Sequence, residues 1–150
     1  MRYKHIWVDA DSCPAKAKNI ILQTAASKAI KVTYVANRTI PFSIQNPLFT
    51  MRVSETIENA ADDIIVAEST AEDIVVTRDL PLAQRLVKKG ITVLNDRGVI
   101  FSENILSKML AERELSLQMQ ALGIATARWN TYSEKDVKNF SSSLAKLLQI

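Results

Sequence analysis

The stretch His5-Ile6-Trp7-Val8-Asp9-Ala10-Asp11-Ser12-Cys13-Pro14 runs from an apolar strand directly into two carboxylates and a proline. Pro14 suits the first turn of a helix, and Ser12 is placed to cap that helix at its N-terminus. The pattern therefore predicts a strand over 4–9 and a helix that continues to about residue 29. A strand that leads straight into a helix is typical of an open α/β sheet, which carries its chemistry at the carboxyl ends of its strands.

The rest of the chain continues this alternation of strands and helices. Strands are predicted over 31–36, 50–53, 73–77 and 91–94, and helices over 58–68, 81–90, 103–122 and from residue 133 onward. Asp79 before Pro81 also fits a helix cap, and Ser133 with Asp136 matches a capping box. We therefore expect one α/β domain over residues 1–150, with three layers: a mostly parallel sheet of about five strands and helices on both faces.

The residue types limit the chemistry that the chain can carry. Cys13 and His5 are its only cysteine and histidine, which excludes an intrachain disulfide and a thiolate zinc cluster. Cys13 is predicted to be a small packed residue, because a cysteine phosphatase loop needs an arginine where Asn19 stands and a nearby histidine is lacking. Any metal site would use oxygen ligands, which suit Mg²⁺, Mn²⁺ or Ca²⁺.

The N-terminal residues and the hydropathy bear on localisation. Met1-Arg2-Tyr3-Lys4 leads into a strand without a signal-peptide pattern. No apolar run approaches the roughly 20 residues that a membrane-spanning helix needs. We expect a cytoplasmic protein without a membrane partner.

Charge is segregated along the chain. Residues 55–80 carry eight acidic residues against one basic residue, whereas residues 1–54 carry eight basic residues against two acidic ones. An acidic middle between basic ends fits a carboxylate pocket on a surface that attracts phosphates. The alternative is chance segregation on a solvated surface.

Acidic residues follow several of the predicted strands. Asp9 and Asp11 follow the first, Asp79 follows the strand over 73–77, and Asp96 follows the strand over 91–94. In a parallel sheet these positions share one edge, which Asp62 in the preceding helix can also reach. Converging carboxylates repel one another unless a divalent cation binds. We predict that Asp9, Asp11 and Asp79 are catalytic and hold Mg²⁺ or Mn²⁺, assisted by Asp62 or Asp96; the alternative is that each aspartate caps a helix.

Basic and aromatic residues supply candidate contacts to a substrate. Lys16 and Arg38 lie near the ends of the first two strands, and Arg113 lies on an apolar stripe of the long helix. Either Arg113 reaches solvent or it pairs with an acidic residue or a phosphate. Phe42 and Phe49, in a loop that contains proline, are candidates for stacking on bases, whereas Trp7 and Tyr34 are expected in the core.

These motifs resemble the bacterial YaiI/YqxD family over nearly the whole chain. The resemblance is carried by Trp7-Val8-Asp9-Ala10-Asp11-Ser12-Cys13-Pro14, Val35-Ala36-Asn37, Ala61-Asp62, Thr77-Arg78-Asp79-Leu80-Pro81-Leu82-Ala83, Arg97-Gly98 and Arg113. It adds Asn37 and Arg97 to the candidate substrate-binding residues.

The resemblance implies a fold related to PIN-like domains, a group rich in Mg²⁺- or Mn²⁺-dependent ribonucleases. It implies Asp9, Asp11, Asp62 and Asp79 as the acidic cluster. The chain departs from the family pattern at Ile57-Glu58-Asn59, where relatives tend to carry Gly-x-Asp, and at Thr126-Ala127-Arg128-Trp129, where they tend to carry Thr-Gly-Gly-Pro.

Three functional hypotheses follow. The leading one is a metal-dependent nuclease that hydrolyses phosphodiester bonds, with RNA as the expected substrate. The second is a non-catalytic PIN-like module that binds RNA or a protein. The third is a phosphatase of the haloacid dehalogenase type with Asp9 as nucleophile, although its later acidic pair should follow a strand and Asp62-Asp63 is predicted in a helix.

Overall fold

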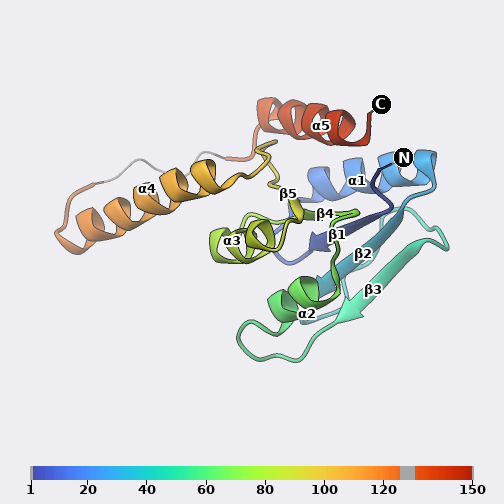
Figure 1. Ribbon diagram of the computed structural model, residues 1–150, viewed down its shortest axis with the longest axis horizontal. Coiled ribbons are helices and arrows are strands. Elements are labelled where there is room, and N and C mark those ends of the chain that lie inside the picture. The colour runs from blue at the N-terminus through green and yellow to red at the C-terminus, as the bar shows by residue number, and fades with distance from the viewer. Residues whose placement is uncertain (1, 126–130, 150) are drawn as a thin grey trace.

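Five strands form one sheet in the computed structural model, which describes residues 2–125 and 131–149 (Figure 1). The strands are β1 (His5–Asp9), β2 (Lys31–Ala36), β3 (Phe49–Val53), β4 (Asp73–Val76) and β5 (Thr92–Leu94). Every neighbouring pair is parallel, and the strand order is β3-β2-β1-β4-β5. The predicted α/β fold is confirmed, and the architecture is consistent with the PIN-like fold that the resemblance implies.

The strand order reverses at β1. The chain adds β2 and β3 on one side of β1 and then returns to place β4 and β5 on the other. Val8 of β1 is in register with Val76 of β4, and Asp9 with Val35 of β2. The carboxyl ends of β1 and β4 therefore flank the point at which the connections diverge, where open α/β sheets bind their ligands.

Helices cover both faces of the sheet, as the alternation predicted (Figure 1). The first face carries α1 (Ala15–Lys28) and α5 (Glu134–Leu148), which contact each other. The second face carries α2 (Ala60–Glu68) and α3 (Leu80–Lys88), and α4 (Glu103–Ala121) packs against α3. The predicted ends of these helices differ from the observed ends by at most a few residues.

The strand sequences explain why both faces are covered. Ile6 and Val8 of β1 pack with α1 and α5, whereas Trp7 between them packs toward α2 and α3. All four residues of β4 are buried, including Asp73, whose Oδ2 accepts a hydrogen bond of 3.0 Å from Trp7 Nε1. Strands that are apolar on both sides are typical of a parallel sheet between two helical layers.

The helix starts show which capping predictions hold. Asp79 caps α3 by accepting a hydrogen bond from the Leu82 N–H at 2.9 Å, and Ser133 with Asp136 forms a complete capping box on α5; both were predicted. The prediction that Ser12 caps α1 is wrong. Pro14 occupies that position without a capping side chain, and the Ser12 hydroxyl faces Asp9 instead.

Two aromatic residues predicted in the loop after β2 pack against the core: Phe42, in that loop, and Phe49, which is the first residue of β3. Phe49 is buried, and the ring of Phe42 lies 4.5 Å from that of Tyr34 and 5.8 Å from that of Phe49. The rings pack against one another at tilted angles and belong to the core cluster, which argues against Phe42 and Phe49 as candidates for stacking on bases. The predicted irregular segment 124–132 lies partly outside the described residues, since these do not include 126–130.

The long helix α4 extends away from the sheet beyond its contact with α3 (Figure 1). Leu106 is its one buried residue, and Leu115 and Leu117 are more than half exposed. Arg113 is also exposed on this outer part of the helix. Among the residues that the structure describes, no helix has the length and apolar character needed to cross a membrane.

Candidate functional site

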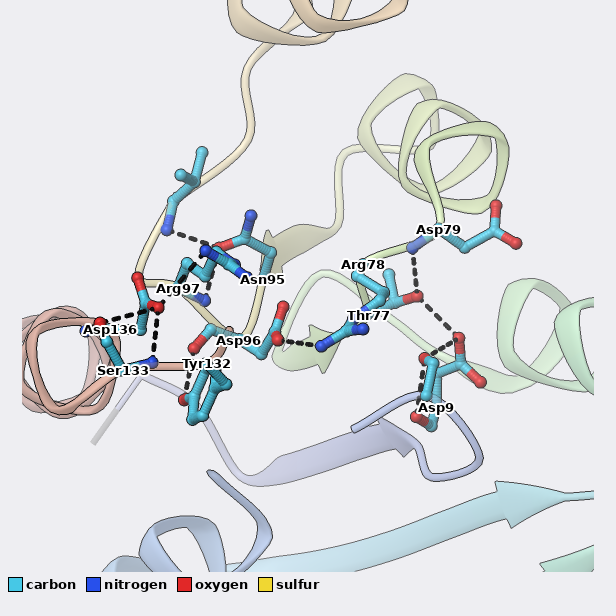
Figure 2. A network of polar contacts seen from close by, with 12 residues as sticks. Asp9, Thr77, Arg78, Asp79, Asn95, Asp96, Arg97, Tyr132, Ser133 and Asp136 are labelled. Atoms are coloured by element: carbon cyan, nitrogen blue, oxygen red, sulfur yellow. Dashed lines mark hydrogen bonds and ion pairs between the residues drawn. The ribbon is translucent and has the colours of Figure 1, made fainter. Parts of the chain in front are cut away.

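Thr77 joins the carboxyl ends of β1 and β4. Its hydroxyl donates a hydrogen bond of 2.8 Å to Asp9 Oδ2 and accepts one of 3.0 Å from the Asp79 N–H, as Figure 2 shows. The Ser12 hydroxyl lies 3.3 Å from the same Asp9 oxygen. One carboxylate oxygen of Asp9 is thus fixed by two hydroxyl groups, and the other accepts no side-chain hydrogen bond from the described residues.

Asp9, Asp62 and Asp79 form an electrostatically coupled group of carboxylates. Burial raises the pKa of Asp62 to about 6, helped by the negative charges of Asp79 and Asp9. Burial also raises the pKa of Asp9, against the hydrogen bonds from Thr77 and Ser12 and with the help of Asp79 and Asp11. The charges of Asp9 in β1, Asp62 in α2 and Asp79 at the start of α3 therefore act on one another.

Asp11 lies at the outer side of this group. Its Oδ1 accepts a hydrogen bond of 3.3 Å from Arg38 Nε, and both side chains are substantially exposed. Arg38 follows β2, and Asn37 before it is also exposed. Two predicted site residues thus meet as an ion pair, which leaves the Arg38 guanidinium near the predicted metal ligands.

Asp96 takes a different position from the one predicted for a metal ligand. Its carboxylate forms an ion pair with Arg78, which directly follows β4 (Figure 2). Only 5% of the Asp96 side chain is exposed, against 42% of Arg78. Arg78 and Asp96 therefore form a second polar group, beside the carboxylates of Asp9, Asp62 and Asp79.

A narrow crevice connects the two groups. It is lined by Asp9, Ser12, Cys13, Val76, Thr77, Arg78 and Asp96. Burial raises the pKa of the Cys13 thiol to about 12, so it remains protonated at neutral pH, in line with its predicted role as a packed residue. The crevice has no space for a water molecule, so a ligand would lie at its rim, on the accessible sides of Asp9 and Arg78.

The charges of the predicted metal ligands act on one another, but their side chains do not surround a single point. In residues 2–125 and 131–149, no three His, Cys, Asp or Glu side chains are grouped closely enough to hold a metal ion as they stand. One oxygen of Asp79 is occupied by the cap of α3. The donor chemistry still suits a hard cation, because these carboxylates repel one another and supply only oxygen atoms.

The remaining predicted substrate-binding residues pair with acidic residues of α5 or lie on α4. Lys16 forms an ion pair of 2.6 Å with Glu134 of α5, and Arg97 lies 3.3 Å from Asp136, also of α5. Arg113 lies on the outer part of α4 and has no described contact with the acidic residues. The structure therefore brings together Asp9, Asp11, Asp62, Asp79 and Arg38, but leaves these three cations outside that group.

Two residues at the centre of the site were missed as site residues. From the sequence, Thr77 and Arg78 are named only within the motif that carries the family resemblance, and Asp79 alone is assigned a role in that motif. The signal was available: the carboxyl end of β4 faces that of β1 in any sheet with this strand order, so every polar side chain there is a candidate.

Comparison with known proteins identifies relatives along almost the whole chain. The model of the family described as "Uncharacterized BCR, YaiI/YqxD family" matches residues 7–150. A UPF0178 protein of Treponema denticola is 39% identical over 143 residues, which cover 95% of this chain and 90% of the relative. A UPF0178 protein of Treponema pallidum is 36% identical over 149 residues, covering 97% and 84%, and one of Psychromonas ingrahamii is 33% identical over 144 residues, covering 96% and 95%.

The matched residues include the end of β1 up to Asp9, the Thr77-Arg78-Asp79 segment and the turn around Asp96. Both polar groups at the carboxyl edge of the sheet therefore lie inside the region that defines the family. The chain belongs to the YaiI/YqxD family.

Proposed function

We propose that this protein is a divalent-metal-dependent nuclease that hydrolyses phosphodiester bonds, with RNA as its substrate. The observation that carries the proposal is the coupled group of Asp9, Asp62 and Asp79 at the carboxyl edge of the sheet. Burial raises the pKa values of Asp9 and Asp62, and the negative charge of Asp79 raises them further. A site that collects negative charge in this way is stabilised when a cation binds.

Asp9, Asp62 and Asp79 would hold the cation, with Asp11, whose charge acts on Asp9, as a further candidate ligand. Mg²⁺ or Mn²⁺ bound there would supply Lewis-acid stabilisation of a phosphoryl oxygen and lower the pKa of a water molecule. Thr77 and Ser12 hold one oxygen of Asp9 in place, which fixes the orientation of the carboxylate for a cation that would bind its other oxygen. Arg38 offers a positive charge to a phosphate at the outer side of the site.

Calorimetry with Mn²⁺ tests the metal site without a guess about the substrate. We expect the wild type to bind Mn²⁺ saturably, and Asp9→Asn and Asp62→Asn to lose at least tenfold in affinity. Asp63→Asn is the matched control: Asp63 is the next residue of the same helix, but its carboxylate pairs with Arg85 at 3.0 Å. It removes the same charge and should bind Mn²⁺ like the wild type.

Cleavage of a labelled single-stranded RNA of mixed sequence in the presence of Mn²⁺ tests the activity. Cleavage should require Asp9 and Asp62 and tolerate Asp63→Asn. If the wild type binds no Mn²⁺, or if Asp9→Asn binds it equally well, the metal-dependent nuclease is excluded. RNA binding without cleavage under any metal would instead favour the non-catalytic PIN-like module.

A further inference from the structure

Arg78 occupies the accessible rim of the crevice. It follows β4 directly, and its side chain lines the crevice together with Asp9, Ser12 and Thr77. One amino group, Nη2, donates to Asp96 Oδ2. A guanidinium has five N–H donors, and its others have no hydrogen-bond partner among the described residues. Arg78 therefore presents unused donors beside Asp9 on a side chain that is 42% exposed.

Asp96 is held rigidly behind Arg78. Its carbonyl oxygen accepts a hydrogen bond of 2.6 Å from the Tyr132 hydroxyl. The neighbouring Asn95 Oδ1 accepts bonds of 3.0 Å from the Arg97 N–H and 2.8 Å from the Val99 N–H, which close the turn that carries Asp96 (Figure 2). The buried carboxylate can thus hold the arginine side chain in one orientation.

Stability alone gives little reason for this pair. A buried carboxylate pays a large desolvation penalty, and an apolar pair of similar size is often as stable or more stable. Arg78 is half exposed, so solvent screens part of the attraction that would offset this penalty. A buried acid that orients a half-exposed arginine is instead the arrangement expected where the remaining donors bind a ligand.

We propose that Arg78 binds a phosphate of the RNA backbone at the crevice beside Asp9, and that Asp96 is the residue that positions it. The planar guanidinium fork matches two phosphate oxygens at once, which a lysine ammonium does not. The inference rests on the proposed function for its ligand, since it places a phosphate next to the group of Asp9, Asp62 and Asp79. It assigns Asp96 to substrate positioning and not to the metal.

Fluorescence anisotropy with a 5′-labelled, single-stranded 12-mer RNA in EDTA tests this assignment apart from metal and cleavage. Arg78→Gln should weaken RNA binding at least tenfold and reduce the slope of log K against log salt by about 0.7, the loss of one phosphate contact. Arg78→Lys should recover the salt slope but only part of the affinity. Asp96→Asn should weaken binding less than Arg78→Gln does, because the guanidinium remains but is no longer held.

Arg52→Gln is the matched control. Arg52 lies on β3, pairs with Glu68 at 2.6 Å and is 43% exposed, so it resembles Arg78 in charge, pairing and exposure but lies two strands from β1. It should bind RNA within about twofold of the wild type. If Arg78→Gln does not fold, the double variant Arg78→Gln/Asp96→Asn removes the unpaired buried charge and carries the same expectation for binding.

The outcomes separate this assignment from the nuclease proposal. Wild-type affinity in a folded Arg78→Gln, or equal losses in Arg78→Gln and Arg52→Gln, would overturn the assignment, as would a wild type that does not bind RNA. Arg78→Gln should keep wild-type Mn²⁺ affinity. Weaker RNA binding in Arg78→Gln, together with a wild type that binds no Mn²⁺, would support phosphate binding by Arg78 while excluding the metal-dependent nuclease.

Discussion

The hydroxyl of Thr77 reaches Asp9 Oδ2 at 2.8 Å and so links two strand ends that lie 68 residues apart in the sequence. The Thr77 hydroxyl oxygen also accepts a hydrogen bond from the N–H of Asp79, the residue that caps α3. One buried hydroxyl thereby fixes the orientation of the Asp9 carboxylate relative to the start of a helix. This explains how β1, β4 and α3 keep a common geometry at the point where the strand order of the sheet reverses.

Replacing Thr77 by valine should destabilise the protein and weaken Mn²⁺ binding. The valine has the same shape but leaves the Asp79 N–H without its acceptor and Asp9 without one of its two hydroxyl donors, a cost of about 1–3 kcal/mol in the free energy of unfolding. Urea denaturation at pH 7 measures the first effect, and calorimetry with Mn²⁺ the second. Thr77→Ser keeps the hydroxyl and should retain most of both, so equal losses in the two variants would argue against the hydrogen bonds as the cause.

The pKa of Asp62 predicts that stability depends on pH. Because the pKa of this acid rises from 3.8 in the unfolded chain to about 6 in the folded protein, the folded state binds more protons between these values. The contribution of Asp62 is therefore most favourable below pH 4 and is lost as the pH rises through 6. Asp62→Asn should raise the unfolding temperature at pH 7.5 and have little effect at pH 3.5.

The matched variant for this pH profile is Asp63→Asn. It removes a carboxylate from the same helix as Asp62, and this carboxylate is paired with Arg85 of α3. It should not raise the unfolding temperature at pH 7.5. In saturating Mn²⁺, the wild type should have a higher unfolding temperature than Asp62→Asn, because bound Mn²⁺ stabilises the wild type more. A stability gain in Asp63→Asn equal to that in Asp62→Asn would show that general charge reduction, and not the local cluster, explains the effect.

Two substitutions separate the two roles assigned to Asp79. Asp79→Ala removes both the cap of α3 and the carboxylate, and should lower the free energy of unfolding by about 1 kcal/mol. Asp79→Ser keeps a capping oxygen and should retain nearly all of that stability. Both should lose Mn²⁺ affinity in calorimetry. If Asp79→Ser binds Mn²⁺ like the wild type, Asp79 is a helix cap only.

The fold could be predicted from the sequence because its signals are local. Buried strands such as Asp73–Val76, with Pro81 at the next helix start, show the alternation without knowledge of the tertiary structure. The alternation also predicts a parallel sheet, and with it the shared edge of Asp9 and Asp79. These predictions needed only the identity of elements and not the direction of side chains.

The partners of the site residues could not be predicted in the same way. Whether Asp96 faces Asp9 or Arg78 depends on the turn that follows β5, and the position of Arg113 depends on how far α4 extends past α3. Likewise, Ser12 is equally suited by sequence to cap α1 or to donate to Asp9, and only the backbone path of Pro14 decides between them. Long-range packing sets these choices, which residue type and spacing do not encode.

Gly98 sets the distance between the Asp96 turn and α5. Its φ is +88°, and a Cβ there would lie 2.5 Å from the backbone oxygen of Asn139, so any side chain must push α5 outward. Ser143 also donates a hydrogen bond of 2.6 Å to the Gly98 carbonyl. Gly90 offers a control, because its φ is +83° but no atom lies within 4 Å of the added Cβ.

Gly90→Ala should therefore cost only the backbone strain of a left-handed residue, about 1–2 kcal/mol, whereas Gly98→Ala should cost clearly more in urea denaturation. The displacement of α5 also disturbs the turn that holds Asp96, so Gly98→Ala should weaken RNA binding through Arg78 while Gly90→Ala leaves it unchanged. Equal stability losses in the two variants would mean that α5 moves away from the added Cβ at Asn139 without a further cost in stability. The turn would then not depend on α5 for its geometry, and the hydrogen bonds of Asn95 and of the Tyr132 hydroxyl would hold Asp96 against Arg78.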